Sequence, residues 1–426
     1  MSEATSFEQF AQRPLPSWFE ENLFGIFIHW GAYSVAGWAE PIGALGTIDW
    51  DTWFRHNPYS EWYANTIRID GSPAQQHHRD TYGDMPYDGL LDLWLAEHYD
   101  PADWAALFRR AGAGYVVPTT KHHDGIALWD APSSEGRNTV ARGPKRDLIE
   151  PLAEAVRAEG MHFGAYYSGG LDWDQRPFPP HRHDIDVHDT FRPKDAEYGA
   201  YCALQCRDLI DRYQPEVLWN DIEWPDDAKN FDEGGLGTLF NYFYSQVPTG
   251  VVNDRYGDTH ADYLTSEYSD GLENEKAAGA WENCRGIGYS FAYNQLEDTA
   301  HYLSGYDLAR MLTDIVSRGG HLLLNVGPKA DGTLPDEQRR ALEDLGLWMD
   351  TAREVLFGSR PAATDDVVAE DSVWVRGVQR DGFRTLFVDL EATDREVGAK
   401  ARLHVAGVPV EVSLPAGRRG PVLLQA

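Results

Sequence analysis

The stretch Glu216-Val217-Leu218-Trp219-Asn220-Asp221 has the pattern of a short buried strand that ends in two polar residues. The loop that follows, residues 223–227, contains a proline and cannot continue the strand. Because side chains alternate along a strand, Val217, Trp219 and Asp221 should share one face. A ring and a carboxylate would then point the same way, an arrangement that suits a sugar. A core tryptophan followed by a helix-capping aspartate explains the stretch equally well.

Buried runs of the same kind recur on both sides of this stretch and mostly alternate with helical patterns. We predict further strands at 24–31, 115–120, 162–167, 251–255, 263–268, 286–293 and 321–326. We predict helices at 101–112, 146–159, 197–213, 236–245, 306–317 and 335–355. Fully buried strands that alternate with helices are typical of a parallel sheet. About eight such units predict a (β/α)8-like barrel with long insertions.

The pattern changes after residue 357. Residues 358–426 contain runs of period two, such as 373–376, 385–388 and 401–405, and no helical pattern. We therefore predict a catalytic barrel in residues 1–357 and a small antiparallel β-sandwich domain in residues 358–426. Within the barrel, the irregular segment 32–100 is too long for one crossover and is expected to cover a site.

The charge balance limits the partners. The chain has 426 residues and a formal net charge of −31, which argues against nucleic acid or an anionic membrane as a partner. Only seven of its 37 basic residues are lysines. Few lysines together with a large acidic excess favour a halophilic source, in which salt screens the surface repulsion. An ordinary acidic protein is the alternative.

Cysteine usage and the terminal sequence bear on the compartment. Three cysteines without a CxxC motif predict reduced, buried thiols and a cytoplasmic protein. The first residues show no signal-peptide pattern, and no apolar run is long enough for a membrane helix. We expect no membrane partner, and a homo-oligomer is possible.

Polar side chains gather at the predicted strand ends. In a barrel enzyme the chemistry lies at the carboxyl ends of the strands. Six separate segments place a polar residue there, which is hard to attribute to packing even though each one alone has a structural explanation. The residues are His29, His122 with His123, Tyr166, Asp221, Arg255 and Glu267.

The chain resembles the α-L-fucosidases of glycoside hydrolase family 29 in several motifs that follow one order across residues 24–335. The matching stretches are FGIFIHWG, PTTKHHDGIALWD, RGPKRDL, FGAYYSGGLDW, PEVLWNDIEW, VNDRYG, TSEY, WENCRGIGYSFAYN and GGHLLLNVGPKADGTLP. The Pro and Leu that precede the WENC piece in the family are absent here. The resemblance implies a retaining exo-α-L-fucosidase that acts on fucosylated glycans or glycosides.

The resemblance also assigns residues. It implies Asp221 as the nucleophile and Glu267 as the acid/base, a role in which the family varies. Glu61, Glu223, Asp172 and Glu282 are the other acid/base candidates. The residues implied to contact the sugar are His29, His122, His123, Tyr166, Trp219 and Arg255, with Glu61, Trp62 and Phe291 as further walls of the site.

Two alternatives stay open. A metal-dependent hydrolase could use His29, His122, His123 and Asp221 as ligands. Against it, neighbouring His122 and His123 should point to opposite faces of an extended chain, and the histidines between 181 and 188 should be solvated. A carbohydrate-binding protein on an inactive barrel is the other alternative, although Asp221 is present. From these histidine arguments we expect no metal. No GxGxxG opens a helix, so we also expect no nucleotide cofactor.

Overall fold

The computed structural model describes residues 3–268, 279–391, 395 and 397–426, and it contains a curled parallel sheet of eight strands. The strand order is β5-β4-β3-β2-β1-β8-β7-β6. The strands are β1 (Phe24–Ile28), β2 (Tyr115–Lys121), β3 (His162–Tyr167), β4 (Val217–Asn220), β5 (Val251–Val252), β6 (Leu264–Glu267), β7 (Trp281–Gly286) and β8 (Gly320–Val326). The predicted barrel-like fold is confirmed.

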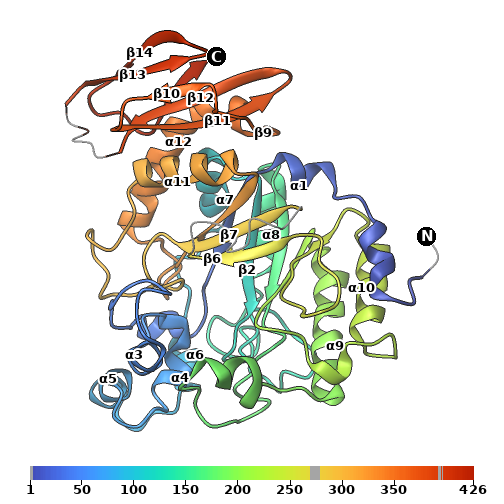
Figure 1. The fold of residues 1–426 in the computed structure, drawn as a ribbon. Helices are drawn as coiled ribbons and strands as arrows, with labels where there is room; N and C mark the ends of the chain where they lie inside the picture. The colour runs from blue at the N-terminus through green and yellow to red at the C-terminus, as the bar shows by residue number, and fades with distance from the viewer. Residues whose placement is uncertain (1–2, 269–278, 392–394, 396) are drawn as a thin grey trace.

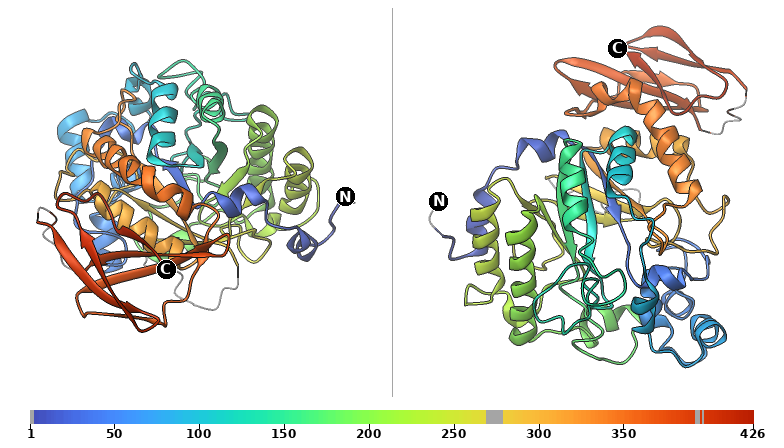
Figure 2. Two further views of the ribbon diagram at one scale, coloured as in Figure 1. Left: turned by 90° about the horizontal axis from the view of Figure 1, so that it is seen from above. Right: turned by 180° about the vertical axis from the view of Figure 1, so that it is seen from behind.

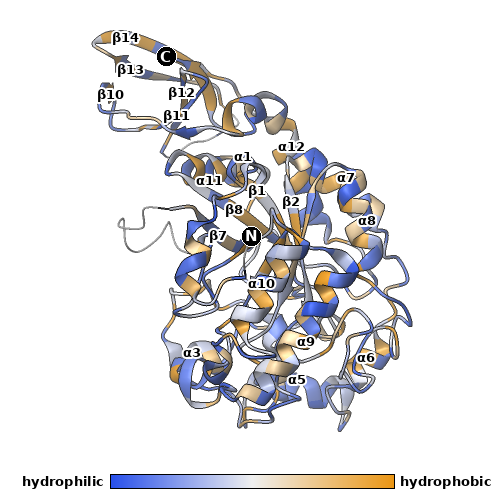
Figure 3. Cartoon of the chain, turned by 90° about the vertical axis from the view of Figure 1, so that its right-hand side faces the viewer, coloured by the Kyte–Doolittle hydropathy of each residue, from blue (hydrophilic) through white to orange (hydrophobic). Residues whose placement is uncertain are grey.

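Six helices from residue 101 onward connect or follow these strands. They are α7 (Pro101–Ala111), α8 (Glu150–Ala158), α9 (Ala196–Tyr213), α10 (Leu236–Gln246), α11 (Gly305–Ser317) and α12 (Asp336–Leu356). Asp100 caps α7 by accepting from two backbone amides, and Gly112 ends it in the left-handed conformation. Hydrophilic and hydrophobic residues mix along the helices in Figure 3, as expected when one face packs on the sheet and the other meets solvent.

The two edge strands of the sheet, β5 and β6, meet through side chains and loop atoms. The amide and hydroxyl of Thr265 donate to the Asp254 carboxylate at 3.0 and 2.7 Å. Arg255 Nε donates to Thr265 Oγ1 at 3.2 Å, and the Asp262 amide donates to the Val252 carbonyl oxygen at 2.9 Å. Among the described residues, the β5–β6 seam is therefore held mainly by side chains rather than by a strand ladder.

Short helices follow β1 and stand beside the carboxyl ends of the strands. They are α2 (Tyr33–Ala36), α3 (Trp50–Arg55), η2 (Ser60–Trp62), α4 (Tyr63–Thr66), α5 (Pro73–Tyr82) and α6 (Gly89–Leu93). In Figure 1 this blue segment lies at the end of the barrel opposite the C-terminal strands. Two further short helices, η3 (Asp186–Thr190) and η4 (Asp226–Ala228), follow β3 and β4, and η1 (Phe7–Gln12) and α1 (Ser17–Glu21) precede β1.

The C-terminal residues form two antiparallel sheets. One has the order β10-β13-β14 and the other β15-β12-β11-β9. The strands are β9 (Arg360–Pro361), β10 (Val367–Ala369), β11 (Val373–Arg380), β12 (Phe383–Leu390), β13 (Ala399–Val405), β14 (Val408–Leu414) and β15 (Val422–Gln425). Trp348 of α12 packs on Phe387 and donates its indole proton to the Pro421 carbonyl at 3.0 Å. The views of Figure 2 place these sheets beyond α11 and α12.

One strand prediction is wrong. Residues 286–293 do not form a strand, because the strand in this region is β7, Trp281–Gly286. The amides of Tyr289 and Ser290 both donate to the Glu297 carboxylate at 2.8 Å, so they are satisfied by a side chain. In the part of the chain that the structure describes, no helix is long and apolar enough to cross a membrane.

Candidate active site

A pocket at the carboxyl end of the barrel brings together all eleven residues predicted to form the site. They are His29, Glu61, Trp62, His122, His123, Tyr166, Trp219, Asp221, Arg255, Glu267 and Phe291. Trp219 lies on β4 and Asp221 directly follows that strand, and both line the same pocket. The alternation expected of the opening stretch is therefore present in the structure.

Asp221 is buried and strongly hydrogen-bonded. Its Oδ1 accepts from Arg255 Nη1 at 2.7 Å and from the Ile222 amide at 2.8 Å, and its Oδ2 accepts from the Tyr166 hydroxyl at 2.7 Å. Burial alone would raise the pKa of Asp221, but the charge of Arg255, assisted by His123 and Tyr166, outweighs it and lowers the pKa below 3.8. Asp221 is thus held as a carboxylate.

The backbone after Asp221 is strained. Ile222 has φ +68°, a left-handed conformation that β-branched residues rarely adopt. The Ile222 amide, at the start of this strained residue, donates to Asp221 Oδ1. Strain of this kind persists where the surrounding structure enforces it, and it clusters at functional sites.

Arg255 joins two carboxylates. Its Nη1 donates to Asp221 and its Nη2 donates to Glu267 Oε2 at 2.9 Å. The guanidinium carbon lies 4.7 Å from the centre of the Trp219 ring, in cation–π contact. The other oxygen of Glu267 accepts from the Tyr59 hydroxyl at 3.0 Å. One rigid cation therefore keeps Asp221 and Glu267 close to each other at the edge of the β5–β6 seam.

The other acidic candidates differ in their surroundings. Glu282 is buried and accepts from the Tyr115 hydroxyl at 2.5 Å and from Trp219 Nε1 at 3.1 Å, and it does not line the pocket. Burial raises its pKa to about 7. Asp172 pairs with Lys121, and Glu223 pairs with Lys229 outside the pocket.

Glu61 is the third carboxylate that belongs to the predicted set. One of its oxygens accepts from the Ala292 amide at 2.9 Å and from the Ser290 hydroxyl at 3.2 Å. Burial raises its pKa to about 7. Because Glu61 lines the pocket and is held by the loop of residues 287–304, it connects the α3–α4 segment to that loop.

Hydrogen bonding fixes which nitrogen of His123 carries the proton. Ser168 gives its only hydroxyl proton to the Leu171 carbonyl at 2.6 Å, so its oxygen accepts from His123 Nδ1 at 2.7 Å. Burial lowers the pKa of His123 to about 4, so the ring is neutral at pH 7. His123 Nε2 is therefore an acceptor, and it lies 3.6 Å from Asp221 Oδ2. Two acceptors that face each other in this way leave room for a donor such as a sugar hydroxyl.

His29 is oriented by the same logic. Asn325 donates its amide NH2 to the Phe291 carbonyl, and its side-chain oxygen accepts from His29 Nδ1 at 2.7 Å. Burial also lowers the pKa of His29 to about 4. His29 Nε2 is then a second acceptor in the pocket, and it can receive a hydroxyl proton.

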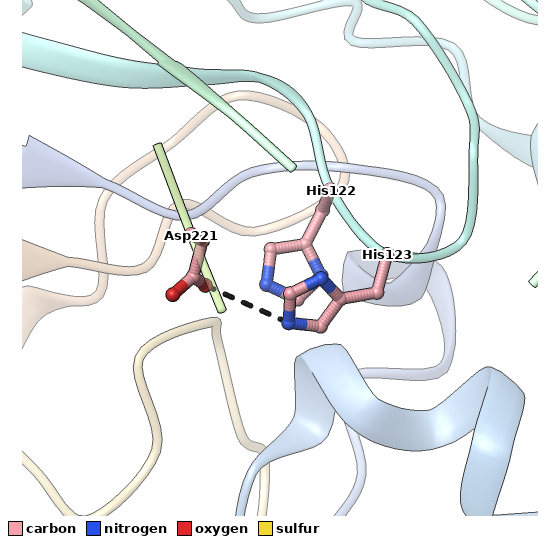
Figure 4. A group of neighbouring side chains, drawn as sticks. All are labelled: His122, His123 and Asp221. Atoms are coloured by element: carbon pink, nitrogen blue, oxygen red, sulfur yellow. Dashed lines mark ion pairs between the residues drawn. The ribbon is translucent and has the colours of Figure 1, made fainter. Parts of the chain in front are cut away.

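The prediction that His122 and His123 point to opposite faces is wrong. Strand β2 ends at Lys121, so both histidines lie in the turn that follows, and their ring centres are 4.1 Å apart. Ligand atoms of His122, His123 and Asp221 lie within 4.8 Å of one another, a spacing that could hold a metal ion (Figure 4). However, Arg255 already binds Asp221 at 2.7 Å, and its charge would oppose a second cation there.

The histidines of the loop after β3 differ in burial. His181 is fully buried rather than solvated, because Trp173 Nε1 donates to its Nδ1 at 3.2 Å. His183 is exposed and pairs with Asp51 at 3.0 Å. His188 is also exposed, but it lines the pocket.

Sequence reasoning missed about half of the pocket wall. Phe27 shares a strand face with His29, so strand alternation could have indicated it. Cys284 lies on β7, a strand that the sequence did not predict. The remaining residues come from loops that carry no period, although the cluster of aromatic residues at 50–54 is a compositional signal. The missed wall residues are Phe27, Leu45, Trp50, Trp53, Phe54, Tyr59, Asp184, Val187, His188, Ile222 and Cys284.

Two carboxylates joined by an arginine, in an aromatic pocket at the carboxyl end of a parallel barrel, define a glycoside hydrolase of the barrel class. The model of one family, described as Alpha-L-fucosidase, matches residues 2–354. The chain therefore belongs to the alpha-L-fucosidase family. The metal-hydrolase and inactive-barrel alternatives are not favoured.

Relatives from distant organisms agree. An alpha-L-fucosidase of Dictyostelium discoideum is 32% identical over 366 residues, covering 84% of this chain and 74% of the relative. The tissue alpha-L-fucosidase of Homo sapiens is 31% identical, covering 85% and 73%. Among solved structures, Thermotoga maritima alpha-fucosidase in complex with fucose superposes with a TM-score of 0.84 at 40% identity, covering 97% of this chain and 96% of that one.

Proposed function

We propose that this protein is a retaining exo-α-L-fucosidase that removes terminal α-L-fucosyl residues from glycans or glycosides through a covalent glycosyl-aspartate intermediate. The observation that carries this proposal is the Arg255 guanidinium, which binds Asp221 at 2.7 Å and Glu267 at 2.9 Å. Retaining glycosidases need two carboxyl groups only about 5–5.5 Å apart. A guanidinium that binds both carboxyl groups keeps them near each other, as this mechanism requires.

The two carboxylates take different roles in the proposed mechanism. Asp221 attacks the anomeric carbon while the bond to the leaving oxygen breaks, and Glu267 gives that oxygen a proton. Glu267 then takes a proton from water, whose oxygen attacks the same carbon and releases Asp221. Arg255 contacts both carboxyl groups in the resting enzyme and so holds them on the same side of the pocket.

The remaining pocket residues fit a single small sugar. The pocket has a volume of about 150 Å³, which is small beside the roughly 300–1,000 Å³ of sites for drug-sized ligands. His29 and His123 present acceptors to hydroxyl protons, and rings form the walls against which a methyl group and C–H faces can pack. We assign sugar binding to His29, Glu61, Trp62, His122, His123, Tyr166, Trp219, Arg255 and Phe291.

The nucleophile is tested by removing its carboxylate. Asp221→Gly should lower kcat on an aryl α-L-fucoside by at least about 10⁴-fold, as when other enzymes lose their nucleophile. Azide should partly restore turnover, because it fits the vacated space and attacks the anomeric carbon directly. Proton NMR should then show fucosyl azide of inverted, β configuration. A variant that keeps its full activity would refute the assignment of Asp221.

Glu267→Ala is the matched control in the same assay. It keeps Asp221, so azide should act on the glycosyl-enzyme and give the retained, α azide. Its defect should be largest for poor leaving groups, which depend most on proton donation. All assays contain a chelator, so a metal-dependent hydrolase would be inactive throughout. If Glu267→Ala also gave the β azide, the two roles would have to be reassigned.

The proposed setting is the salt-rich cytoplasm of a halophile. A net charge of −31 with few lysines is best tolerated where salt screens the surface. Cys202, Cys206 and Cys284 are free and buried, which suits a reducing compartment. The assays above are therefore to be run across a salt series.

We also propose that residues 1–357 form the catalytic unit and residues 358–426 a separate C-terminal β-domain. Helix α12 ends at Leu356 and the first C-terminal strand begins at Arg360, which supports a boundary between them. The sheets of the C-terminal part have their own apolar cluster, which includes Leu386, Leu403 and Leu414.

A further inference from the structure

The wall of the pocket changes character along helix α3. Trp53 and Phe54 are 4% and 2% exposed, whereas Trp50 at the start of the same helix is 45% exposed. All three line the pocket. Trp50 packs edge-on against Trp53, with ring centres 5.7 Å apart. Trp50 is therefore the place where the aromatic wall reaches solvent, and it defines the rim of the pocket.

Another part of the rim is polar. Asp184 and His188 line the pocket and are exposed, and His188 Nε2 lies 3.5 Å from Asp184 Oδ1. The neighbouring His183 pairs with Asp51 of helix α3 at 3.0 Å. This contact ties the loop after β3 to the helix that carries Trp50. The rim thus has an aromatic part and a polar part, and the His183–Asp51 contact links the two segments that carry them.

The chemistry of the site decides what meets this rim. The reacting carbon of the sugar must lie against Asp221, which is only 8% exposed and is surrounded by buried residues of the strand ends. Glu267 must reach the leaving oxygen at the same time. The atoms beyond that oxygen then extend from the buried part of the pocket toward the exposed part, where Trp50 lies.

We propose that Trp50, together with Leu45, Asp184 and His188 of the same pocket wall, forms a leaving-group subsite for a neutral, ring-shaped group such as a pyranose or an aryl ring. This inference rests on the proposed function. A flat ring with apolar faces gains from stacking on the exposed indole. Asp184, Asp51 and the net charge of −31 disfavour an anionic leaving group.

The test distinguishes recognition of the fucosyl group from recognition of the leaving group. L-Fucosyl fluoride has no leaving ring, whereas an aryl fucoside and a neutral fucosyl disaccharide each have one. Trp50→Ala should lower kcat/KM about tenfold for the aryl fucoside and the disaccharide. It should change kcat/KM for the fluoride and the inhibition constant of L-fucose less than twofold. Trp50→Phe should retain most of the activity on both ring-bearing substrates.

The controls make each outcome decisive. Leu95→Ala removes another exposed apolar side chain, 57% exposed and outside the pocket, and should change none of these values. Equal losses on the fluoride and the ring-bearing substrates would overturn the proposal, and so would no loss at all. Turnover of the fluoride by the wild type shows that the proposed function holds, so its failure is recognised separately. Thermal melting confirms that each variant is folded.

The charge preference has its own pair of substrates. The 4-carbamoylphenyl and 4-carboxyphenyl fucosides differ mainly by one negative charge at the far end of the ring. The wild type should prefer the neutral substrate, and Asp184→Asn should reduce that preference at low salt, where screening is weak. If the ratio of kcat/KM for the neutral and the charged fucoside is the same in Asp184→Asn as in the wild type, the role of Asp184 is refuted. The stacking role of Trp50 is tested independently by the Trp50 variants.

Discussion

Two ion pairs involve residues at the ends of β2 and β4, the strands on either side of β3, and they differ in what surrounds them. Lys121 at the end of β2 pairs with Asp172 at 2.8 Å, and both side chains are fully buried. Asp221 at the end of β4 pairs with Arg255 at the same range of distance, 2.7 Å, but this pair lines the pocket. The first pair is closed and the second is open.

In the closed pair, protein groups use the available oxygens. Asp172 Oδ1 accepts from the amides of Asp174 and Gln175 at 3.1 and 3.0 Å, and Lys121 lies over the rings of Tyr167 and Tyr201. Burial alone would lower the pKa of Lys121, but Asp172 outweighs it and raises the pKa. The same chemistry thus serves folding where it is enclosed and reaction where one side faces a cavity.

The largest expected effect comes from breaking the closed pair. Lys121→Met leaves Asp172 buried without its cation, and removing one partner of a buried pair costs about 3–5 kcal/mol. Urea unfolding should show this loss, while kcat of the folded variant at low temperature should change little because Lys121 does not line the pocket. Lys194→Met, which breaks an exposed pair with Asp189, is the control and should cost less than about 1 kcal/mol.

Breaking the open pair should affect the reaction more than the fold. Arg255→Met removes the charge that lowers the pKa of Asp221, so burial then raises this pKa. Asp221 must be ionised to attack, and the acid limb of the pH dependence of kcat/KM should move to higher pH. We expect kcat/KM at pH 7 to fall about 10²–10³-fold, the usual cost of one preorganised donor.

The matched control for this prediction is Arg176→Met. Arg176 pairs with Asp195 away from the pocket, so the acid limb should not move. An unchanged acid limb in Arg255→Met would show that Arg255 does not govern the ionisation of Asp221.

The smallest expected effect concerns the backbone beside the open pair. Ile222→Gly should relieve left-handed strain, worth about 1–2 kcal/mol, less the added entropy of the unfolded chain. We expect a net gain of about 1 kcal/mol in the free energy of unfolding and a loss of severalfold in kcat, because glycine gives the backbone that follows Asp221 more freedom. Gln214→Gly, at φ +45° on the C-cap of α9, should stabilise without changing kcat. A loss of stability in Ile222→Gly would contradict the strain argument.

The sequence predicted those parts of the fold in which burial shows as an apolar run. Strands β3 and β4 and helices α7 and α9 lie within one or two residues of their predicted places. Strand β7 was missed because its sequence, Trp281 to Gly286, is polar. Its Glu282 is buried only because Tyr115 and Trp219 supply partners from other strands, which no local pattern reveals.

The site residues were identified by the resemblance to the family, whereas their orientations became known only from the structure. The bend after Lys121, which brings the rings of His122 and His123 together, cannot be predicted from alternation along a strand. The proton positions on His29 and His123 depend on Asn325 and Ser168, which lie far away in sequence. The rim at Trp50 depends on how one short helix sits over the barrel.

The β5–β6 seam has a consequence for how the enzyme loses activity on heating. A strand ladder shares its load over many backbone bonds, but here Arg255 both fastens the seam through Thr265 and holds Asp221 ionised. Each transient separation of β5 from β6 therefore also weakens the Arg255 contact that keeps Asp221 ionised. Amide protons near the seam should exchange with solvent before those of β1, β2 and β8. On heating, enzymatic activity should be lost at a lower temperature than that of global unfolding.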